Sequence, residues 1–205
     1  MSNLPKIKTG TERREWVYLT DGELERFFSV VNSKGSLRDR ALFRIVYEFG
    51  LRASEPSYLN RNELKTNPDT GECLVMIYRL KGGYHAKLPL SKDATRLLNQ
   101  YLRTRSDQHA ALFYTDYKGG GSIGRHTIYK DFGRFAEAAR IPKKKRFPHI
   151  LRHTIATKLR SSGAKPEDIQ YWLGHVSVAS TMIYAKADEQ VRSNIGRMVT
   201  RIAKR

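Results

Sequence analysis

The chain has 205 residues, of which 40% are apolar and 28% charged, a balance that is typical of a globular protein and excludes a disordered one. A formal net charge of +18 indicates a nucleic-acid partner, because lysine and arginine bind polyanions by releasing condensed counterions. The single cysteine, Cys73, excludes an internal disulfide and a cysteine-ligated metal cluster. No apolar run approaches the roughly 20 residues of a membrane span, and the first residues lack a signal peptide's apolar region. We therefore expect a soluble cytoplasmic protein with no membrane partner.

The first third of the chain is predicted to hold a basic arm and two helices. Residues 1–18 are polar and basic, and we interpret them as an arm or linker. Residues 20–23 form a capping box, and a second helix is predicted to begin near Ser36 and to end at Gly50, with Arg52 just beyond it. The apolar residues behind the capping box fall at helical spacing: Leu24, Phe27, Phe28 and Val31.

The middle of the chain changes to a β-strand pattern. Residues 73–78 and 86–90 are rich in β-forming residues, and we predict that they pair through a hairpin connection over 81–85. Lys81 lies near the start of that connection. The sequence therefore predicts a small antiparallel sheet near the middle of the domain.

The remainder is predicted to be mostly helical. A helix over 92–103 is followed by a short strand over 111–114 and a glycine-rich turn over 118–124, which lacks the Gly-Lys-Ser/Thr ending of a phosphate-binding loop. From Arg125 onward helices follow one another, with breaks at residues 141–142, 161–163, 174 and around 187. The predicted fold class is mainly α with a small antiparallel β-sheet (α+β).

The run 147–154 is the densest group of candidate site residues. Pro148 suits a helix start, and His149 and Arg152 share one helical face because they are three residues apart. An imidazole beside a permanently charged guanidinium can handle a proton and an anion together. His149 and His153 have the spacing of part of a zinc site, but no Glu follows His149 and a metal would need further ligands. We interpret His153 as a supporting histidine and predict no metal site.

Two further candidates follow near the C-terminus. Residues 173–175, Leu-Gly-His, end a helix and present His175 at a turn, and Tyr184 lies in the helical segment after it. One tyrosine among 11 is more often a packing residue than a nucleophile. With an ordinary pKa of about 10, its phenol would need its developing charge stabilised before it attacked a substrate.

Taken in chain order, these motifs closely resemble the catalytic domain of tyrosine recombinases, the phage-integrase family. The resemblance covers roughly residues 20 to 190, and its strength comes from five fragments in one order with compatible spacing. The fragments are the run 50–55 (Gly-Leu-Arg-Ala-Ser-Glu), the Lys81 hairpin, His149-x-x-Arg152-His153-Thr154, Leu173-Gly174-His175 and Tyr184.

The resemblance implies a role in DNA strand exchange for each matched residue. Tyr184 matches the nucleophile, which attacks a DNA phosphodiester and leaves a 3′-phosphotyrosyl link with a free 5′-hydroxyl. Arg52 and Arg152 match the two arginines that hold the non-bridging oxygens, a role that suits a planar, always-charged fork. His149 matches the residue that assists proton transfer at the tyrosine.

The other matched residues complete this site. Lys81 matches the hairpin lysine that protonates the leaving 5′-oxygen. His175 matches the position that hydrogen-bonds the phosphate, and Glu55 matches an acidic residue that supports the site. Two arginines and a lysine supply the charge that a metal supplies elsewhere, so the resemblance implies a reaction without metal, ATP or cofactor. It also implies a site-specific recombinase or integrase of the kind found in mobile genetic elements.

The resemblance also suggests how the chain is organised. Residues 19–187 match the catalytic domain, and the short arm over 1–18 indicates either a member that consists of this domain alone or an excised fragment. An apolar stripe over 188–205 predicts a C-terminal helix. Periodicity alone allows that helix to fold back on its own domain, whereas the resemblance favours docking on a neighbouring protomer. The implied partners are double-stranded DNA, a homotetramer on DNA and an accessory DNA-bending protein, with a cytoplasmic, nucleoid-associated location.

One departure and two alternatives stand beside this interpretation. Pro56 follows Glu55 where the family has an aliphatic residue, which puts the local helix in question. Residues 162–186 also fit a helix-turn-helix, so that a DNA-binding protein without chemistry would explain the charge but not Arg52 or Lys81. A type IB-like topoisomerase would use the same residue set but would relax supercoils without a specific site.

Overall fold

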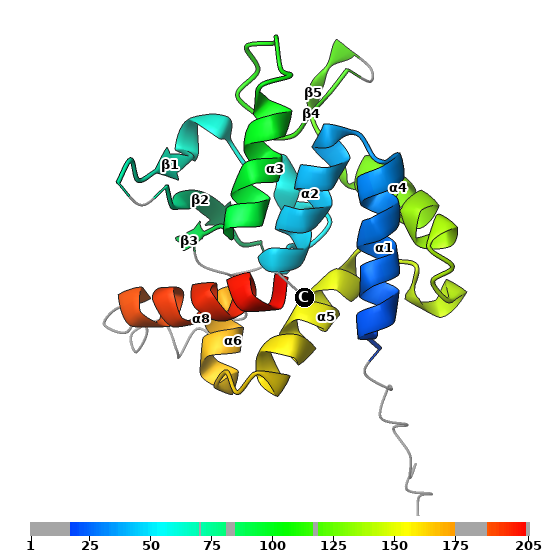
Figure 1. Ribbon diagram of the computed structural model, residues 1–205. Coiled ribbons are helices and arrows are strands. Elements are labelled where there is room, and N and C mark those ends of the chain that lie inside the picture. Colours follow the sequence, from blue (N-terminus) through cyan, green and yellow to red (C-terminus); the bar gives the residue numbers. More distant parts are fainter. Residues whose placement is uncertain (1–16, 70, 81–84, 117–118, 175–187, 204–205) are drawn as a thin grey trace, which may run out of the picture.

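The computed structural model describes residues 17–69, 71–80, 85–116, 119–174 and 188–203, which are mostly helical, with one small antiparallel sheet at the left of the molecule and another at the top (Figure 1). The helices are α1 (Asp21–Lys34), α2 (Leu37–Glu48), α3 (Lys92–Leu102), α4 (Arg125–Ala138), α5 (His149–Ser161), α6 (Pro166–Leu173) and α8 (Asp188–Ala203). The strands are β1 (Lys65–Thr66), β2 (Cys73–Tyr78), β3 (His85–Pro89), β4 (Tyr114–Thr115) and β5 (Gly121–Ser122). Short 3₁₀ helices are η1 (Glu55–Tyr58), η2 (Arg61–Glu63) and η4 (Lys143–Lys145). The predicted fold class is confirmed.

Two capping boxes set the starts of α1 and α2. The Thr20 hydroxyl accepts the backbone N–H of Glu23, whose carboxylate accepts the backbone N–H of Thr20 at 2.8 Å. Ser36 and Asp39 repeat this exchange at α2. Each cap contributes about 1 kcal/mol to helix stability. The predicted start and end of α2 are confirmed, because the helix ends just before Gly50, which has a φ of 56°.

The predicted antiparallel pair is also confirmed. Strands β2 and β3 are paired along their lengths, with Val75 opposite Leu88, and the short strand β1 extends the sheet on the other side of β2. Cys73, Val75 and Ile77 alternate inward into the core. The connection over 81–84 lies outside the described residues.

The predicted strand over 111–114 is wrong in its bounds. Ala111 forms only an isolated bridge to Asn60, and the ladder between β4 and β5 begins at Tyr114. The reason is a side chain: the Arg105 guanidinium donates to the carbonyls of Ala111 and Leu112, at 2.5 and 3.1 Å. These carbonyls are therefore satisfied without a strand partner. Strand β5 lies inside the segment that we had predicted to be a turn.

Helix α2 lies at the centre of the molecule, between α1 and α3, and contacts α5 below it (Figure 1). Its side chains from Ala41 to Tyr47 are nearly all buried. An aromatic cluster joins α1, α2 and α4, in which the rings of Phe27 and Phe132 lie 4.9 Å apart. Because α2 is held on several sides, the chain that leaves its C-terminal end is fixed in position, and Arg52 lies on that chain.

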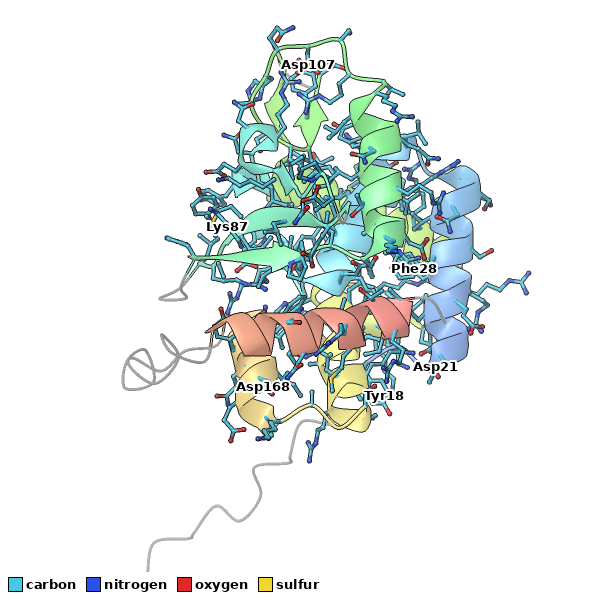
Figure 2. The ribbon with its side chains drawn as sticks, turned by 60° about the vertical axis from the view of Figure 1, so that its left-hand side comes forward. Tyr18, Asp21, Phe28, Lys87, Asp107 and Asp168 are labelled. Atoms are coloured by element: carbon cyan, nitrogen blue, oxygen red, sulfur yellow. The ribbon has the colours of Figure 1, made fainter. Side chains whose placement is uncertain are left out.

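Helix α8 packs against α5, α6 and β3 of its own chain (Figure 2). Ile195 and Val199 are each 1% exposed and Ile202 is 9% exposed, so the apolar face over 195–202 packs against the domain to which it belongs. Docking on a neighbouring protomer, which the resemblance implies, stays a prediction. None of the helices in the described ranges is long and apolar enough to cross a membrane.

Candidate active site

The turn after α2 brings Arg52 toward the end of α6. Gly50 takes a φ of 56°, a conformation that glycine adopts without strain. A Cβ atom at Gly50 would lie 2.4 Å from Cδ2 of Leu173, so this position also requires glycine for close contact with α6. The turn therefore holds the backbone of Gly50 against α5 and α6, with Arg52 two residues further along.

Arg52 is fixed by Glu55, which follows it in η1. The Arg52 Nη1 donates to Oε1 of Glu55 at 2.7 Å, and its backbone N–H donates to Oε2 at 2.8 Å. Burial raises the pKa of Glu55, but the nearby Arg79 charge and the hydrogen bonds from Arg52 outweigh it and hold the pKa below its usual value. Pro56 occupies the first turn of η1, where a proline fits, so the departure from the family pattern is accommodated by a short 3₁₀ helix.

Arg152 reaches the same junction from α5. It is 2% exposed, and its Nη1 and Nη2 donate to the carbonyls of Gly50 and Leu173 at 2.6 and 2.8 Å. Burial, together with the positive charges of Arg79 and Arg52, lowers its pKa to about 9, so the side chain is charged at neutral pH. A guanidinium carries five N–H donors, and bonds to two carbonyls leave it able to bind an anion as well.

The two histidines of α5 border a cleft beside this junction. His149 is the first residue of the helix, and its ring meets that of His153 edge to face, with centroids 4.8 Å apart. The cleft, of about 890 Å³, lies between α5 and α6, and both histidines and Arg152 line it. Burial and the charge of Arg152 lower the pKa of His153, which is therefore mainly neutral at pH 7. The cleft thus places Arg152 beside an imidazole able to accept or donate a proton.

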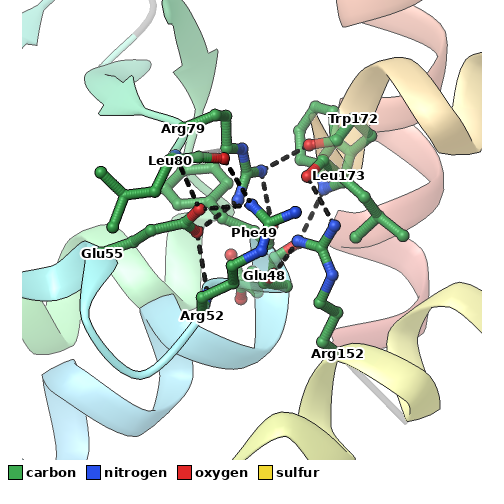
Figure 3. Close-up of polar contacts among 10 residues, drawn as sticks. Glu48, Phe49, Arg52, Glu55, Arg79, Leu80, Arg152, Trp172 and Leu173 are labelled. Carbon is green, nitrogen blue, oxygen red and sulfur yellow. Dashed lines mark hydrogen bonds and ion pairs between the residues drawn. The ribbon is translucent and has the colours of Figure 1, made fainter. Parts of the chain in front are cut away.

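A third arginine in this site, Arg79, was missed by the sequence analysis. It is 4% exposed, its Nη1 forms an ion pair with Oε2 of Glu55 at 3.1 Å, and its Nη2 donates to the carbonyl of Phe49 at 2.7 Å and to that of Trp172 (Figure 3). A signal was present in the sequence. Arg79 continues the inward alternation of Val75 and Ile77, and an arginine at an inward position requires a buried partner.

The predicted residues Lys81, His175 and Tyr184 lie outside the described residues. The residues just before Lys81 and just before His175 do belong to this junction. The Arg52 Nη1 donates to the carbonyl of Leu80 at 3.3 Å, one residue before Lys81. The carbonyl that binds Arg152 belongs to Leu173, two residues before His175. Of the predicted set, the structure brings Arg52, Glu55 and Arg152 together, with His149 and His153 on the same helix as Arg152.

The sequence profile described as the phage integrase family matches residues 17–191. The chain belongs to this family. It is similar to the tyrosine recombinase XerC of Listeria welshimeri, with 30% identity over 178 residues that cover 82% of this chain and 57% of XerC. The chain therefore spans a little over half the length of that relative.

Solved structures of recombinases share the fold. The XerA recombinase superposes with a TM-score of 0.67 at 25% identity, over 87% of this chain and 63% of XerA. The XerH site-specific recombinase, solved in a pre-cleavage complex with its difH substrate, gives a TM-score of 0.66 at 24% identity, over 82% of this chain and 49% of XerH. The resemblance stated from the motifs is thus confirmed at the level of family and fold.

In this integrase-family chain, the junction combines three guanidinium groups with one carboxylate. Arg52, Arg79 and Arg152 carry positive charge, and Glu55 is the one acidic group among the described contacts. The local excess of positive charge favours an anion, and planar guanidinium groups suit the paired oxygens of a phosphate. The arrangement can therefore bind a phosphodiester and neutralise charge that develops on it.

Proposed function

We propose that the chain is the catalytic part of a site-specific recombinase that cleaves and rejoins double-stranded DNA through a 3′-phosphotyrosyl intermediate at Tyr184. The observation that carries the proposal is the junction of Arg52 and Arg152. Two residues far apart in the sequence are held by backbone carbonyls and Glu55 at the ends of α2 and α6. Membership of the phage integrase family supports the same chemistry.

In the proposed reaction, the phenolic oxygen of Tyr184 attacks the phosphorus atom in line with the 5′-oxygen. The new bond joins the tyrosine to the 3′-phosphate, the bond to the 5′-oxygen breaks, and the phenol's proton passes toward His149. Arg52 and Arg152 bind the non-bridging oxygens, whose negative charge grows in the transition state. Phosphoryl transfer of this kind requires positioning and charge neutralisation more than covalent chemistry by the protein.

The leaving group needs a proton, and we assign its delivery to Lys81. Proton transfer from a positioned side chain accelerates such a step by roughly 10²–10⁴-fold. His175 hydrogen-bonds the phosphate, and Glu55 keeps Arg52 in place. A second 5′-hydroxyl then attacks the phosphotyrosine, which releases Tyr184 and rejoins the strand. Because the phosphotyrosyl bond keeps the energy of the phosphodiester, rejoining requires no ATP.

The proposed partners are two DNA duplexes and four copies of the chain. The charge of +18 supports a DNA partner, and XerH, which shares the fold, was solved with DNA. Exchange of strands between two duplexes requires four cleavage events and hence four active sites. An accessory DNA-bending protein and a cytoplasmic location at the nucleoid belong to the same proposal.

The test is a search for the covalent intermediate. Genomic DNA that flanks the gene is fragmented and incubated with the protein, and adducts that survive denaturation are mapped to the base. A nicked duplex that carries the mapped site then traps the intermediate, because the short strand with the free 5′-hydroxyl diffuses away. The wild-type protein should form an adduct on a denaturing gel, and Tyr184→Phe should bind the duplex without forming one.

Tyr129→Phe is the matched control, because Tyr129 is 39% exposed on α4 and should not affect the adduct. An undiminished adduct with Tyr184→Phe would overturn the assignment of the nucleophile. Binding without an adduct in every variant would favour the helix-turn-helix alternative. Relaxation of a supercoiled plasmid that lacks the mapped site would favour the topoisomerase.

A further inference from the structure

Arg79 contacts three elements that meet at the candidate active site. Its Nη1 pairs with Glu55 in η1, and its Nη2 binds the carbonyls of Phe49 at the end of α2 and Trp172 at the end of α6 (Figure 3). The side chain is 2% exposed. A charged group in the interior is destabilising unless it is well paired, so a buried arginine directly after β2 calls for an explanation beyond packing.

The first link runs from Arg79 to Arg52. The two oxygens of Glu55 are divided between the guanidinium groups, with Oε1 bound to Nη1 of Arg52 and Oε2 to Nη1 of Arg79, while Oε2 also accepts the backbone N–H of Arg52. Oε1 also accepts the backbone N–H of Leu80 at 3.2 Å. Arg79 therefore fixes the rotation of the carboxylate, and the carboxylate fixes the guanidinium of Arg52.

The second link runs from Arg79 to Arg152. Arg79 binds the carbonyl of Trp172, and the next carbonyl, that of Leu173, binds Nη2 of Arg152 at 2.8 Å. The stem of Arg79 also packs against Gly174, where an added Cβ atom would lie 2.4 Å from Cγ of Arg79. Both contacts hold the end of α6 in place, and Gly174 immediately precedes His175.

We propose that Arg79 is a positioning residue that sets the relative placement of Arg52 and Arg152 and adds positive charge behind them. This inference deepens the proposed function and rests on it. Arg79 also precedes Lys81 by two residues, so the same anchor fixes the end of the strand that leads to the proposed general acid. Arg79 itself contacts protein groups, and its effect on the reaction passes through the two other arginines.

The test compares Arg79→Met with a matched control, Arg105→Met. The Arg105 side chain is 4% exposed, and like Arg79 it binds backbone carbonyls, here those of His109, Ala111 and Leu112, and a carboxylate, that of Asp107. It follows the C-terminal end of α3, whereas the N-terminal end of α3 lies at the end of α2 (Figure 2). Helix α3 has 11 residues, so its two ends lie about 16 Å apart. Both variants lose a buried network of hydrogen bonds, but only the network of Arg79 lies at the candidate active site.

Single-turnover cleavage of the nicked duplex is measured at saturating protein, and its rate and final amplitude are read separately. The amplitude reports the folded, competent fraction, and the rate reports the geometry of the site. We expect Arg79→Met to slow cleavage by about 10²-fold, the effect of a misplacement of about 1 Å, with little change in the half-saturating DNA concentration. Arg105→Met should keep the wild-type rate. Equal rates for the two variants would overturn the proposal.

A neutral methylphosphonate at the cleavage site supplies a readout that a structural role would not change. The arginines neutralise charge on the phosphate, so a substrate without that charge depends less on their placement. The cleavage rate of Arg79→Met, relative to that of the wild type, should therefore be reduced by less than about 10-fold on this substrate, against about 10²-fold on the natural phosphate. An unchanged deficit would indicate that Arg79 acts through general stability, against the proposal.

The ¹H–¹⁵N resonances of the Arg52 and Arg152 side chains, assigned with Arg→Lys variants, give a measurement that does not depend on cleavage. Arg79→Met should shift or broaden both resonances, and Arg105→Met neither. If the wild-type chain forms no adduct, the proposed function fails, while this measurement still decides the role of Arg79. Unchanged Arg52 and Arg152 resonances in Arg79→Met would overturn the proposed role of Arg79. Arg79→Lys enters the same assays if the methionine variant does not fold, since its single nitrogen cannot reach all three elements.

Discussion

Glu48 and Ser91 form a buried pair of hydrogen bonds that joins the end of α2 to the start of α3. The Ser91 hydroxyl donates to Oε1 of Glu48 at 2.6 Å, and its backbone N–H donates to Oε2 at 3.2 Å. Glu48 is completely buried, and its backbone carbonyl accepts Nε1–H of Trp172 at 2.8 Å. The residue thereby ties α2 to α3 and to α6, next to the chain segment that carries Arg52.

Glu48→Gln should change how stability depends on pH. Burial raises the pKa of Glu48 to about 7, against hydrogen bonds from Ser91 that lower it. The folded state therefore holds this proton more tightly than the unfolded state, whose glutamate pKa is about 4.3. The contribution of Glu48 is fully present below about pH 4 and is lost as the pH rises through 7.

The measurement is denaturant unfolding of wild type and Glu48→Gln between pH 5 and 8. The free energy of unfolding of the wild type should lose up to about 3 kcal/mol relative to the variant over this range, from about 1.4 kcal/mol for each pKa unit. The difference between the two proteins cancels groups such as Glu55, whose lowered pKa acts in the opposite direction. A constant difference across the range would contradict the prediction.

Lys81→Ala should lose the proton donor for the leaving 5′-oxygen. The expected effect is a decrease of roughly 10²–10⁴-fold in the cleavage rate. A substrate with sulfur in place of the 5′-oxygen, which departs without a proton, should restore most of that rate. Lys87 is the rival, since it lies on β3 opposite Met76. Rescue of Lys87→Ala instead of Lys81→Ala would transfer the role to Lys87.

Gly50→Ala should both destabilise the fold and slow cleavage. Alanine at a φ of 56° costs about 1–2 kcal/mol, and overlap with Leu173 adds roughly 1–3 kcal/mol. The substitution also displaces the carbonyl that binds Arg152. Gly71→Ala is the control, because Gly71 has a φ of 68° and nothing within 4 Å of an added Cβ. Chemical denaturation should show the smaller loss for Gly71→Ala, and cleavage should be unaffected. Equal losses would show that the contact with Leu173 is unimportant.

Local signals in the sequence predicted the elements that local interactions decide. The capping boxes at Thr20 and Ser36 satisfy backbone donors within a few residues, so the starts of α1 and α2 could be predicted without the rest of the chain. The order of the motifs identified Arg52 and Arg152, which the structure brings together. The alternation of β2 marks Arg79 as an inward residue, but its partners come from three distant segments, which no local pattern identifies.

The C-terminal helix shows the same limit. The spacing of Ile195, Val199 and Ile202 predicts that one face is buried, and this is confirmed. Spacing does not reveal which surface covers that face. In the structure β3, α5 and α6 cover it, and contacts between distant parts of the chain decide that outcome.

The contact between α8 and β3 leads to the last prediction. A Cβ atom at Gly196 would lie 2.7 Å from Cγ of Pro89, so alanine there would push the helix away from the strand. Gly196→Ala should lower the free energy of unfolding by about 1–3 kcal/mol. Gly133→Ala in α4 is the matched control: nothing lies within 4 Å of an added Cβ, and alanine should stabilise this helix by about 0.5–1 kcal/mol.

Denaturation of the two glycine variants at several protein concentrations separates packing within the chain from docking on a neighbour. If α8 covers its own domain, the loss in Gly196→Ala is the same at every concentration, because no second molecule takes part. A loss that shrinks on dilution, as the protomers separate, would show that the helix covers another protomer. A gain in stability equal to that of Gly133→Ala would show that α8 does not rest on β3 in solution, and the apolar face of Ile195 and Val199 would then need another partner.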